Sequence, residues 1–197
     1  MRRAAFLDRD GVINVDHAYV CRFEDFEFID GVLEAARLLA DAGFDLIIVT
    51  NQSGIGRGYY TEEDFLALDR QVREVFKKAG APLAGVYFCP HHPKEALPAW
   101  RCVCNCRKPA PGMILKAAQD LSIDLSRSVM FGDKPSDMQA AAAAGIAVRV
   151  QLGTDGKLDP EQPDARATHH ARDLLSALKG PVHFLLEKPA SSVNPQA

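Results

Sequence analysis

The stretch from Ala4 to Asn14 reads Ala-Ala-Phe-Leu-Asp-Arg-Asp-Gly-Val-Ile-Asn and decides how the chain is organised. Four apolar residues, the length of a buried strand, lead to two carboxylates, Asp8 and Asp10. Because side chains alternate in an extended backbone, both acids are expected on one side and Arg9 on the other. Two like charges this close repel each other unless a cation lies between them, so the motif predicts a site for a hard ion such as Mg²⁺. Alone, Asp-Arg-Asp-Gly is equally typical of a strand that ends in a polar turn.

Length and composition favour a single domain without nucleic-acid or membrane partners. At 197 residues and 47% hydrophobic, the chain can bury one core. We expect one domain over 1–187 and a flexible polar tail over 188–197. The net charge of -3 argues against general attraction to nucleic acid or anionic membranes. Near the N-terminus a charged residue follows too soon for the apolar core of a secretory signal, and no apolar run has membrane-spanning length, so we expect a cytoplasmic protein. We also expect a monomer.

Strand-like apolar runs alternate with helical patterns, which predicts a parallel sheet with crossover helices. The expected strands are 4–7, 45–49, 86–89, 129–131 and 147–150, and the expected helices are 31–42, 61–79, 111–121 and 136–144. The predicted fold class is therefore α/β, with a Rossmann-like, doubly wound, mainly parallel sheet. No segment is long enough for a large cap domain, and 153–186 is expected to add a final helix or two.

Polar side chains follow the expected strands at the edge where such sheets bind ligands. Thr50 follows the second strand, Asp133 follows the fourth, and Lys108 stands between the third strand and its helix. Individually, Thr50 is typical of a strand-end cap and Lys108 of a surface charge. Together with Asp8 and Asp10, in this order, they are the groups that phosphoryl transfer requires.

Each of these groups suits one part of that reaction. Asp8 can attack phosphorus to give an aspartyl-phosphate, and Asp10 can give and take the proton. Asp133 can complete a Mg²⁺ site with Asp8 and the backbone carbonyl of Asp10. Thr50 can donate its hydroxyl to the phosphoryl group, and Lys108 can neutralise charge there.

The loop 89–106 carries four of the five cysteines and predicts a structural Zn²⁺ site. The four ligands offered by two closely spaced pairs are Cys89, His91, Cys104 and Cys106. Cys102 is an alternative ligand, and a set of reduced cysteines without metal is the alternative interpretation. Because the loop has few aliphatic residues, zinc would be needed to hold Arg107 and Lys108 rigidly at the site.

These motifs resemble those of the haloacid-dehalogenase-like phosphatases over about Ala4 to Val150. More narrowly, five segments resemble the heptose 1,7-bisphosphate 7-phosphatases. They are Asp16-His17-Ala18-Tyr19-Val20, Thr50-Asn51-Gln52-Ser53-Gly54, Cys89-Pro90-His91-His92-Pro93, Cys104-Asn105-Cys106-Arg107-Lys108-Pro109 and Gly132-Asp133-Lys134. The resemblance implies Asp8 as nucleophile, Asp10 as acid and base, and Mg²⁺ held by Asp8, Asp10 and Asp133. It leaves Cys102 and His92 out of the zinc site.

The resemblance also implies a set of substrate contacts. They are Asp16, His17, Ala18, Tyr19, Thr50, Asn51, Gln52, Ser53, Arg107, Lys108 and Lys134. The implied reaction is removal of the 7-phosphate of D-glycero-D-manno-heptose 1,7-bisphosphate, a small sugar phosphate used for bacterial lipopolysaccharide. Val12 departs from the superfamily, where Thr often follows this glycine, but Val fits the same turn.

Two alternatives stay open on the sequence alone. Histidinol-phosphate phosphatase shares the acids, the Thr-Asn-Gln segment and a similar zinc loop, but Asp16–Tyr19 and Lys134 favour the sugar. A non-catalytic zinc module that binds phosphate or nucleic acid would gain nothing from two acids facing an anion. The sequence does not indicate which anomer of the sugar is the substrate, and it leaves two interpretations open for each of Arg57 and Asp137. Arg57, in the Gly-rich turn 54–58, fits a second phosphate or a solvated loop, and Asp137 fits a partner of Lys108 or a helix cap.

Overall fold

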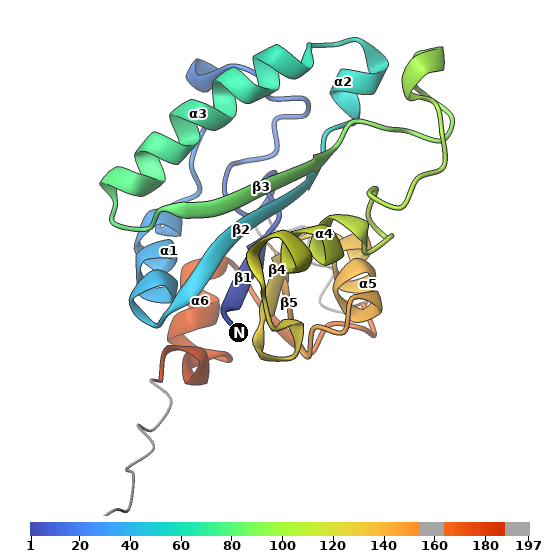
Figure 1. Ribbon diagram of the computed structural model, residues 1–197. Coiled ribbons are helices and arrows are strands. Elements are labelled where there is room, and N and C mark those ends of the chain that lie inside the picture. The colour runs from blue at the N-terminus through green and yellow to red at the C-terminus, as the bar shows by residue number, and fades with distance from the viewer. Residues whose placement is uncertain (154–163, 188–197) are drawn as a thin grey trace, which may run out of the picture.

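Six parallel strands form one sheet in the order β3-β2-β1-β4-β5-β6 (Figure 1). The computed structural model describes residues 1–153 and 164–187. The strands are β1 (Arg3–Leu7), β2 (Phe44–Asn51), β3 (Leu83–Cys89), β4 (Val129–Gly132), β5 (Val148–Leu152) and β6 (His169–Ala171). The chain winds outward from the central β1 in both directions, so the predicted doubly wound, parallel α/β fold is confirmed.

Helices cover both faces of this sheet (Figure 1). They are α1 (Val32–Asp41), α2 (Ser53–Arg57), α3 (Glu62–Lys78), α4 (Gly112–Leu121), α5 (Pro135–Ala143) and α6 (Leu174–Lys179). Short 3₁₀ turns lie at Phe23–Asp25, Pro98–Trp100, Leu125–Arg127 and His183–Leu186. The Gly-rich turn expected over 54–58 is thus the helix α2. Gly56 is required there, because a Cβ at this position would lie 2.3 Å from the carbonyl oxygen of Pro90.

The alternation of β1 divides the core into two layers. Ala5 and Leu7 point into a layer shared with α1, α3 and α6, whereas Ala4 and Phe6 point into a layer shared with α4 and α5. All four side chains are fully buried. A strand buried on both faces reads as a continuous apolar run, which is why the sequence identifies β1 so clearly.

The sequence does not predict β6. This edge strand has three residues, His-His-Ala, and pairs only with β5 among the described strands. It carries no apolar run because its residues are only half-buried or exposed. His170 is exposed, while His169 is half-buried.

The described connections are loops with one or two α-helices each, so no large cap domain covers the sheet in residues 1–153 and 164–187. The tail expected over 188–197 lies outside the described residues. Among the described helices, none combines the length and apolar character needed to cross a membrane. The single-domain boundary at 187 stays a prediction.

The N-terminus of α3 provides a first test of the fold. The Thr61 hydroxyl accepts a hydrogen bond from the Asp64 backbone at 3.1 Å, and the Asp64 carboxylate accepts one from the Thr61 backbone at 2.8 Å. We predict that Thr61→Ala lowers the free energy of unfolding by about 1 kcal/mol, whereas Thr61→Ser keeps it. Urea denaturation measures both, and an alanine variant as stable as the parent would contradict the cap.

Candidate active site

The carboxyl ends of β1, β2 and β4 bring the predicted acids and the hydroxyl together. Leu7 pairs with Ile48 on β2 and with Phe131 on β4, so Asp8 emerges between these two strands. Its backbone N–H donates to the Phe131 carbonyl at 3.0 Å. Asp8 and Thr50 are both almost completely buried. The edge of the sheet therefore holds these polar groups in fixed positions and largely away from water.

Lys108 is buried at the centre of this edge. Its Nζ lies 2.9 Å from Asp8 Oδ1 and 2.6 Å from Asp137 Oδ1, and donates to the Val49 carbonyl at 2.9 Å. Burial alone would lower the pKa of Lys108, but Asp137 and Asp8 outweigh it and the pKa is raised. Lys108 is therefore a fixed positive charge beside Asp8, and the surface-charge interpretation is wrong.

Asp137 performs both roles that the sequence leaves open. One oxygen pairs with Lys108, and the other accepts a hydrogen bond from the Lys134 backbone at the start of α5, at 3.0 Å. Its side chain is completely buried. Asp137 therefore orients Lys108 and caps α5 at the same time.

Asp8 and Asp133 offer oxygens to a cation. Carboxylate oxygens of Asp8, Asp133 and Asp137 lie within 4.8 Å of one another. Burial, together with neighbouring carboxylates, raises the pKa of Asp8 to about 6 and that of Asp133 to about 7. Asp133 Oδ1 is buried and accepts no hydrogen bond from the described residues. Because both oxygens of Asp137 are already paired, the donor set that fits a hard divalent ion is Asp8 and Asp133.

Gly11 allows the chain to pass close to this pair. Its φ is +88°, and a Cβ there would lie 2.3 Å from Asp133 Oδ2. Any side chain would therefore strain the turn and displace the Asp133 carboxylate.

The Asp10 carboxylate lies apart from this acidic group and faces a different cation. Arg9 Nε and Nη2 donate to its two oxygens at 3.2 and 2.9 Å. Burial alone would raise the pKa of Asp10, but Arg9, with hydrogen bonds from Asn14 and Gln52, outweighs it and the pKa is lowered. The prediction that Arg9 points away from Asp10 is wrong, because β1 ends at Leu7 and residues 8–10 are not extended strand.

Gln52 joins Asp10 to the threonine of the site. Its amide nitrogen donates to Asp10 Oδ2 at 3.0 Å and to Thr50 Oγ1 at 2.8 Å, while its amide oxygen accepts from the Tyr60 hydroxyl. Since the Thr50 oxygen accepts this bond, its own proton can be donated to another acceptor. Neither Arg9 nor Tyr60 is predicted from the sequence as part of this network.

Asn51 fixes the backbone of Lys108. Its side-chain oxygen accepts from the Lys108 N–H at 3.0 Å, and its side-chain nitrogen donates to the Lys108 carbonyl at 3.1 Å. This double hydrogen bond attaches the end of β2 to the loop that precedes α4.

A pocket of about 250 Å³ opens beside Asp10 and collects most of the predicted substrate contacts. Its lining consists of Asp10, Asp16, Ala18, Tyr19, Asn51, Gln52, Ser53, Gly54, Tyr60 and Lys134. Lys134 Nζ lies 3.2 Å from Asp16 Oδ2, which ties the loop 15–23 to the end of β4. A larger cavity of about 770 Å³ beside α1 and α6 contains none of the predicted site residues.

Four of the predicted contacts lie outside this lining, and two of them, Thr50 and Lys108, are buried beneath it at the edge of the sheet. The other two are His17 and Arg107. His17 is half exposed and pairs with Glu27 at 2.8 Å, and Arg107 donates to the His91 carbonyl at 3.1 Å. Arg57 pairs with Glu95 of the loop 89–106, and its guanidinium carbon lies 5.8 Å from the Tyr19 ring. The solvated-loop interpretation of Arg57 is therefore wrong.

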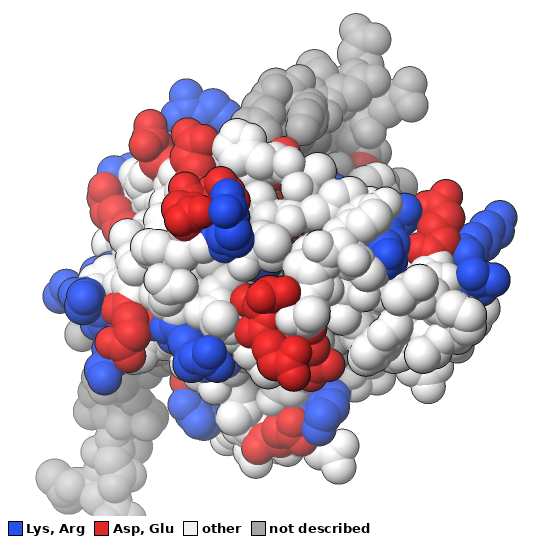
Figure 2. All heavy atoms as spheres, turned by 90° about the horizontal axis from the view of Figure 1, so that it is seen from above, with Lys and Arg blue, Asp and Glu red and all other residues white. Residues whose placement is uncertain are grey.

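The face seen from above the sheet carries acidic and basic side chains in small mixed groups (Figure 2). The described part of this face shows no continuous basic patch. Such a surface gives no footprint for a nucleic-acid backbone.

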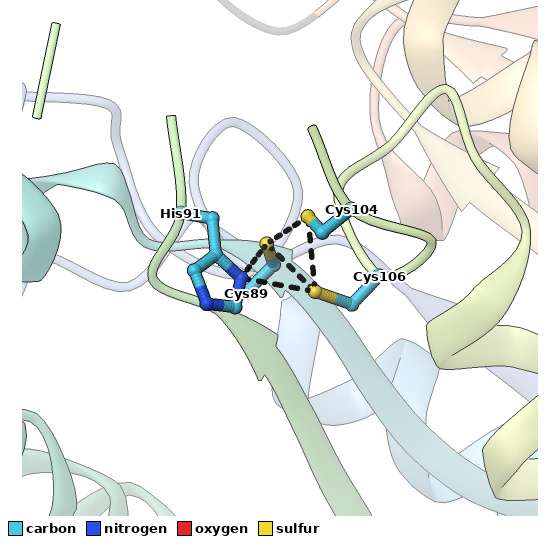
Figure 3. Close-up of side chains that lie close together, drawn as sticks. All are labelled: Cys89, His91, Cys104 and Cys106. Atoms are coloured by element: carbon cyan, nitrogen blue, oxygen red, sulfur yellow. Dashed lines mark hydrogen bonds between the residues drawn. The ribbon is translucent and has the colours of Figure 1, made fainter. Parts of the chain in front are cut away.

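The predicted zinc ligands point toward one another (Figure 3). Cys89 ends β3, and its sulfur lies 3.6 Å from His91 Nδ1, 3.6 Å from Cys104 Sγ and 3.1 Å from Cys106 Sγ. These separations suit ligands around one small ion, and all five cysteines are free thiols. Cys102 is exposed and lies outside the group, as the resemblance implies.

Comparison with known proteins places the chain among phosphatases. Residues 105–177 match the HAD-hydrolase-like family model. The Yersinia pestis protein named D-glycero-beta-D-manno-heptose-1,7-bisphosphate 7-phosphatase is 48% identical over 179 residues, which cover 89% of this chain and 95% of that protein. The Vibrio cholerae protein of the same name is 46% identical over 183 residues, covering 93% and 96%.

Two solved structures have the same fold. The D,D-heptose 1,7-bisphosphate phosphatase from B. bronchiseptica, complexed with magnesium and phosphate, has a TM-score of 0.80 and 29% identity, covering 92% of this chain and 99% of that chain. The D,D-heptose 1,7-bisphosphate phosphatase from Burkholderia thailandensis has a TM-score of 0.66 and 26% identity, covering 94% and 100%.

Proposed function

The chain belongs to the D-glycero-beta-D-manno-heptose-1,7-bisphosphate 7-phosphatases of the haloacid-dehalogenase-like superfamily, and on this premise we propose that it hydrolyses the 7-phosphate of the β anomer of this sugar. The observation that carries the proposal is the buried arrangement of Lys108 against Asp8, with Asp133 beside it. A phosphatase needs a nucleophile, a fixed cation and a metal ligand in one place. Histidinol phosphate is not favoured, because the named relatives act on the heptose.

Asp8 is the proposed nucleophile. Its carboxylate oxygen attacks phosphorus, the bond from phosphorus to the sugar oxygen breaks, and an aspartyl-phosphate forms. Asp10, in its protonated form, gives its proton to the departing sugar oxygen and regains one from the water that attacks the aspartyl-phosphate, so it ends each cycle as it began. Phosphate leaves and Asp8 is regenerated. Lys108 supports this role because its ammonium lies 2.9 Å from Asp8 Oδ1.

Mg²⁺ is the proposed catalytic cofactor, with Asp8, Asp133 and the backbone carbonyl of Asp10 as its protein ligands. The ion would supply positive charge that offsets the repulsion between the carboxylate nucleophile and the phosphoryl oxygens. The raised pKa values of Asp8 and Asp133 and the unpaired Asp133 Oδ1 support this choice.

The substrate is proposed to lie in the pocket beside Asp10. Thr50 would donate its hydroxyl to a phosphoryl oxygen, with Lys108 opposite. Asp16, Ala18, Tyr19, Ser53 and Lys134 line the part of the pocket that fits the sugar. Asn51 and Gln52 act mainly by holding Lys108, Thr50 and Asp10, while His17 and Arg107 stay proposed contacts outside this lining.

Zn²⁺ is the proposed structural ion of the loop 89–106. Three thiolates and an imidazole are the ligands that zinc prefers. Its role is positional, because His91 accepts the hydrogen bond of Arg107 next to Lys108. In the cell, the reaction supplies heptose for lipopolysaccharide, and the cytoplasmic location and the monomeric state stay predictions.

The first test concerns the substrate. We predict that phosphate release, measured with Mg²⁺ present, is fastest from β-heptose 1,7-bisphosphate, slower from the α anomer, and slowest from histidinol phosphate. The Asp8→Asn variant should retain less than about a hundredth of the wild-type turnover, a scale typical of lost catalytic groups. Preference for histidinol phosphate would reject the substrate assignment, and an active Asp8→Asn variant would reject the nucleophile.

The second test concerns the metal site. We predict that Gly11→Ala lowers kcat/KM at limiting Mg²⁺ at least about tenfold, because the new methyl group displaces the Asp133 carboxylate. Gly43→Ala is the matched control, since Gly43 has the same φ of +88° but no atom within 4 Å of the added Cβ. Both variants should lose about 1 kcal/mol of stability from the strained φ, and only Gly11→Ala should need more Mg²⁺. Equal Mg²⁺ dependence in the two variants would contradict the assignment.

The third test concerns zinc. Cys104→Ser is expected to remove the ion, lower the free energy of unfolding by more than about 2 kcal/mol, and lower activity with it. Cys102→Ser, next to the cluster but outside it, should retain zinc, stability and activity. Metal analysis, thermal unfolding and phosphate release measure the three effects. Full activity in a verified zinc-free protein would reject the positional role.

A further inference from the structure

Arg9 is a buried cation with a single charged partner among the described residues. The residue is 4% exposed, and its guanidinium forms a two-point fork on the Asp10 carboxylate, Nε to Oδ2 at 3.2 Å and Nη2 to Oδ1 at 2.9 Å. Two parallel hydrogen bonds of this kind fix the plane of a carboxylate as well as its position.

The surroundings of Arg9 hold the guanidinium in place. Its central carbon lies 5.9 Å from the centre of the Phe26 ring and 5.8 Å from that of Phe65. Nη1 is buried and has no hydrogen-bond partner among the described residues. A buried charge with a donor unpaired is costly, and an apolar side chain of similar size would often be at least as stable there. Stability alone is therefore a poor reason for an arginine at this position.

Arg9 supplies half of the hydrogen bonds that orient Asp10. Its carboxylate accepts four hydrogen bonds, two from Arg9 and one each from Asn14 and Gln52. Only the Arg9 fork holds both oxygens from one rigid group. Asp10 also lines the substrate pocket, so the angle of its carboxylate decides whether it faces the leaving oxygen.

Arg9 also contacts the loop that closes the pocket. Its Nη2 donates to the Val20 carbonyl at 2.9 Å, next to Tyr19 in the pocket lining. The same nitrogen therefore bonds both the Asp10 carboxylate and the backbone of the loop 15–23.

We propose that Arg9 is a positioning residue whose two-point hydrogen bond orients the Asp10 carboxylate toward the leaving oxygen. Through its hydrogen bond to the Val20 carbonyl, Arg9 also links this orientation to the position of the loop 15–23. The inference rests on the proposed function, in which Asp10 transfers the proton. Arg9 itself touches neither the substrate nor the phosphoryl group in this role.

The test compares two leaving groups in Arg9→Met, which fills the space between the rings but lacks the fork. A sugar alkoxide needs a proton to leave, whereas p-nitrophenolate leaves as a stable anion. We expect kcat/KM to fall about 100-fold for heptose 1,7-bisphosphate and by less than about threefold for p-nitrophenyl phosphate. The ratio kcat/KM is used because it reports the phosphorylation step and not the later hydrolysis. Equal losses on the two substrates, or no loss on the sugar, would overturn the proposal.

Arg9→Lys separates the fork from the charge. Lysine keeps the positive charge but cannot bond both oxygens in one plane. We expect its kcat/KM for the sugar to stay within about threefold of that of Arg9→Met. Recovery to the wild-type value would show that charge alone suffices and would overturn the proposal.

Arg37→Met is the matched control. Arg37 forms an ion pair with Asp41 at 3.0 Å on α1, and neither residue lines the pocket beside Asp10, so its loss should leave the ratio between the two substrates unchanged. Thermal unfolding confirms that each variant is folded. If the wild-type protein cleaves p-nitrophenyl phosphate but not the heptose, the substrate assignment fails. The Arg9 comparison is then made on fructose 1,6-bisphosphate, whose 6-phosphate is likewise a primary alkyl ester.

Discussion

The ammonium of Lys108, buried among three oxygens, is the contact on which the rest of the site depends. It lies against Asp8, Asp137 and the Val49 carbonyl, and so joins β1, α5 and β2. A buried charge is tolerated only when it is paired and hydrogen-bonded, and removing one partner leaves the others uncompensated. The arrangement therefore specifies how the loop before α4 must meet the sheet. Asn51 adds two hydrogen bonds to the backbone of the same residue, so the position of the ammonium is fixed from both ends.

The two aspartates of the first loop have opposite environments, although only Arg9 separates them in the sequence. Burial and neighbouring carboxylates raise the pKa of Asp8, while Arg9, Asn14 and Gln52 lower that of Asp10. One carboxylate is thus prepared to share a cation with Asp133, and the other is already neutralised by a side chain. Two carboxyl groups whose pKa values are shifted apart are typical of sites that need two different roles. The division follows from the end of β1 at Leu7, after which the backbone turns and the side chains no longer alternate.

Much of this organisation could be predicted from the sequence because the apolar strand pattern and the polar residues that follow the strands indicate the same fold and the same site. The core strands are continuous apolar runs, and their polar ends meet at one edge because parallel strands share direction. The cluster of three cysteines and one histidine is recognised because these residue types in close pairs have few uses other than binding a metal. By contrast, β6 is a short edge strand whose residues are largely solvated, and its pairing with β5 has no local signal. The start of β3 at Leu83 is hidden for a similar reason, since Ala84 and Gly85 carry little strand propensity.

The residues that the sequence misses at the site share one property, which is that they act on other side chains. Arg9 contacts its chain neighbour Asp10, and Tyr60 contacts Gln52 eight residues earlier, but neither contact follows from a strand or helix period. Strand alternation even gives the wrong direction for Arg9, because the rule holds only while the backbone stays extended. The buried Arg-Asp fork beside Phe26 and Phe65 becomes visible only when the segment that carries Phe26 and the helix α3 are folded over the end of β1. Sequence motifs therefore identify the polar groups at the end of the sheet, while packing determines how those groups are oriented.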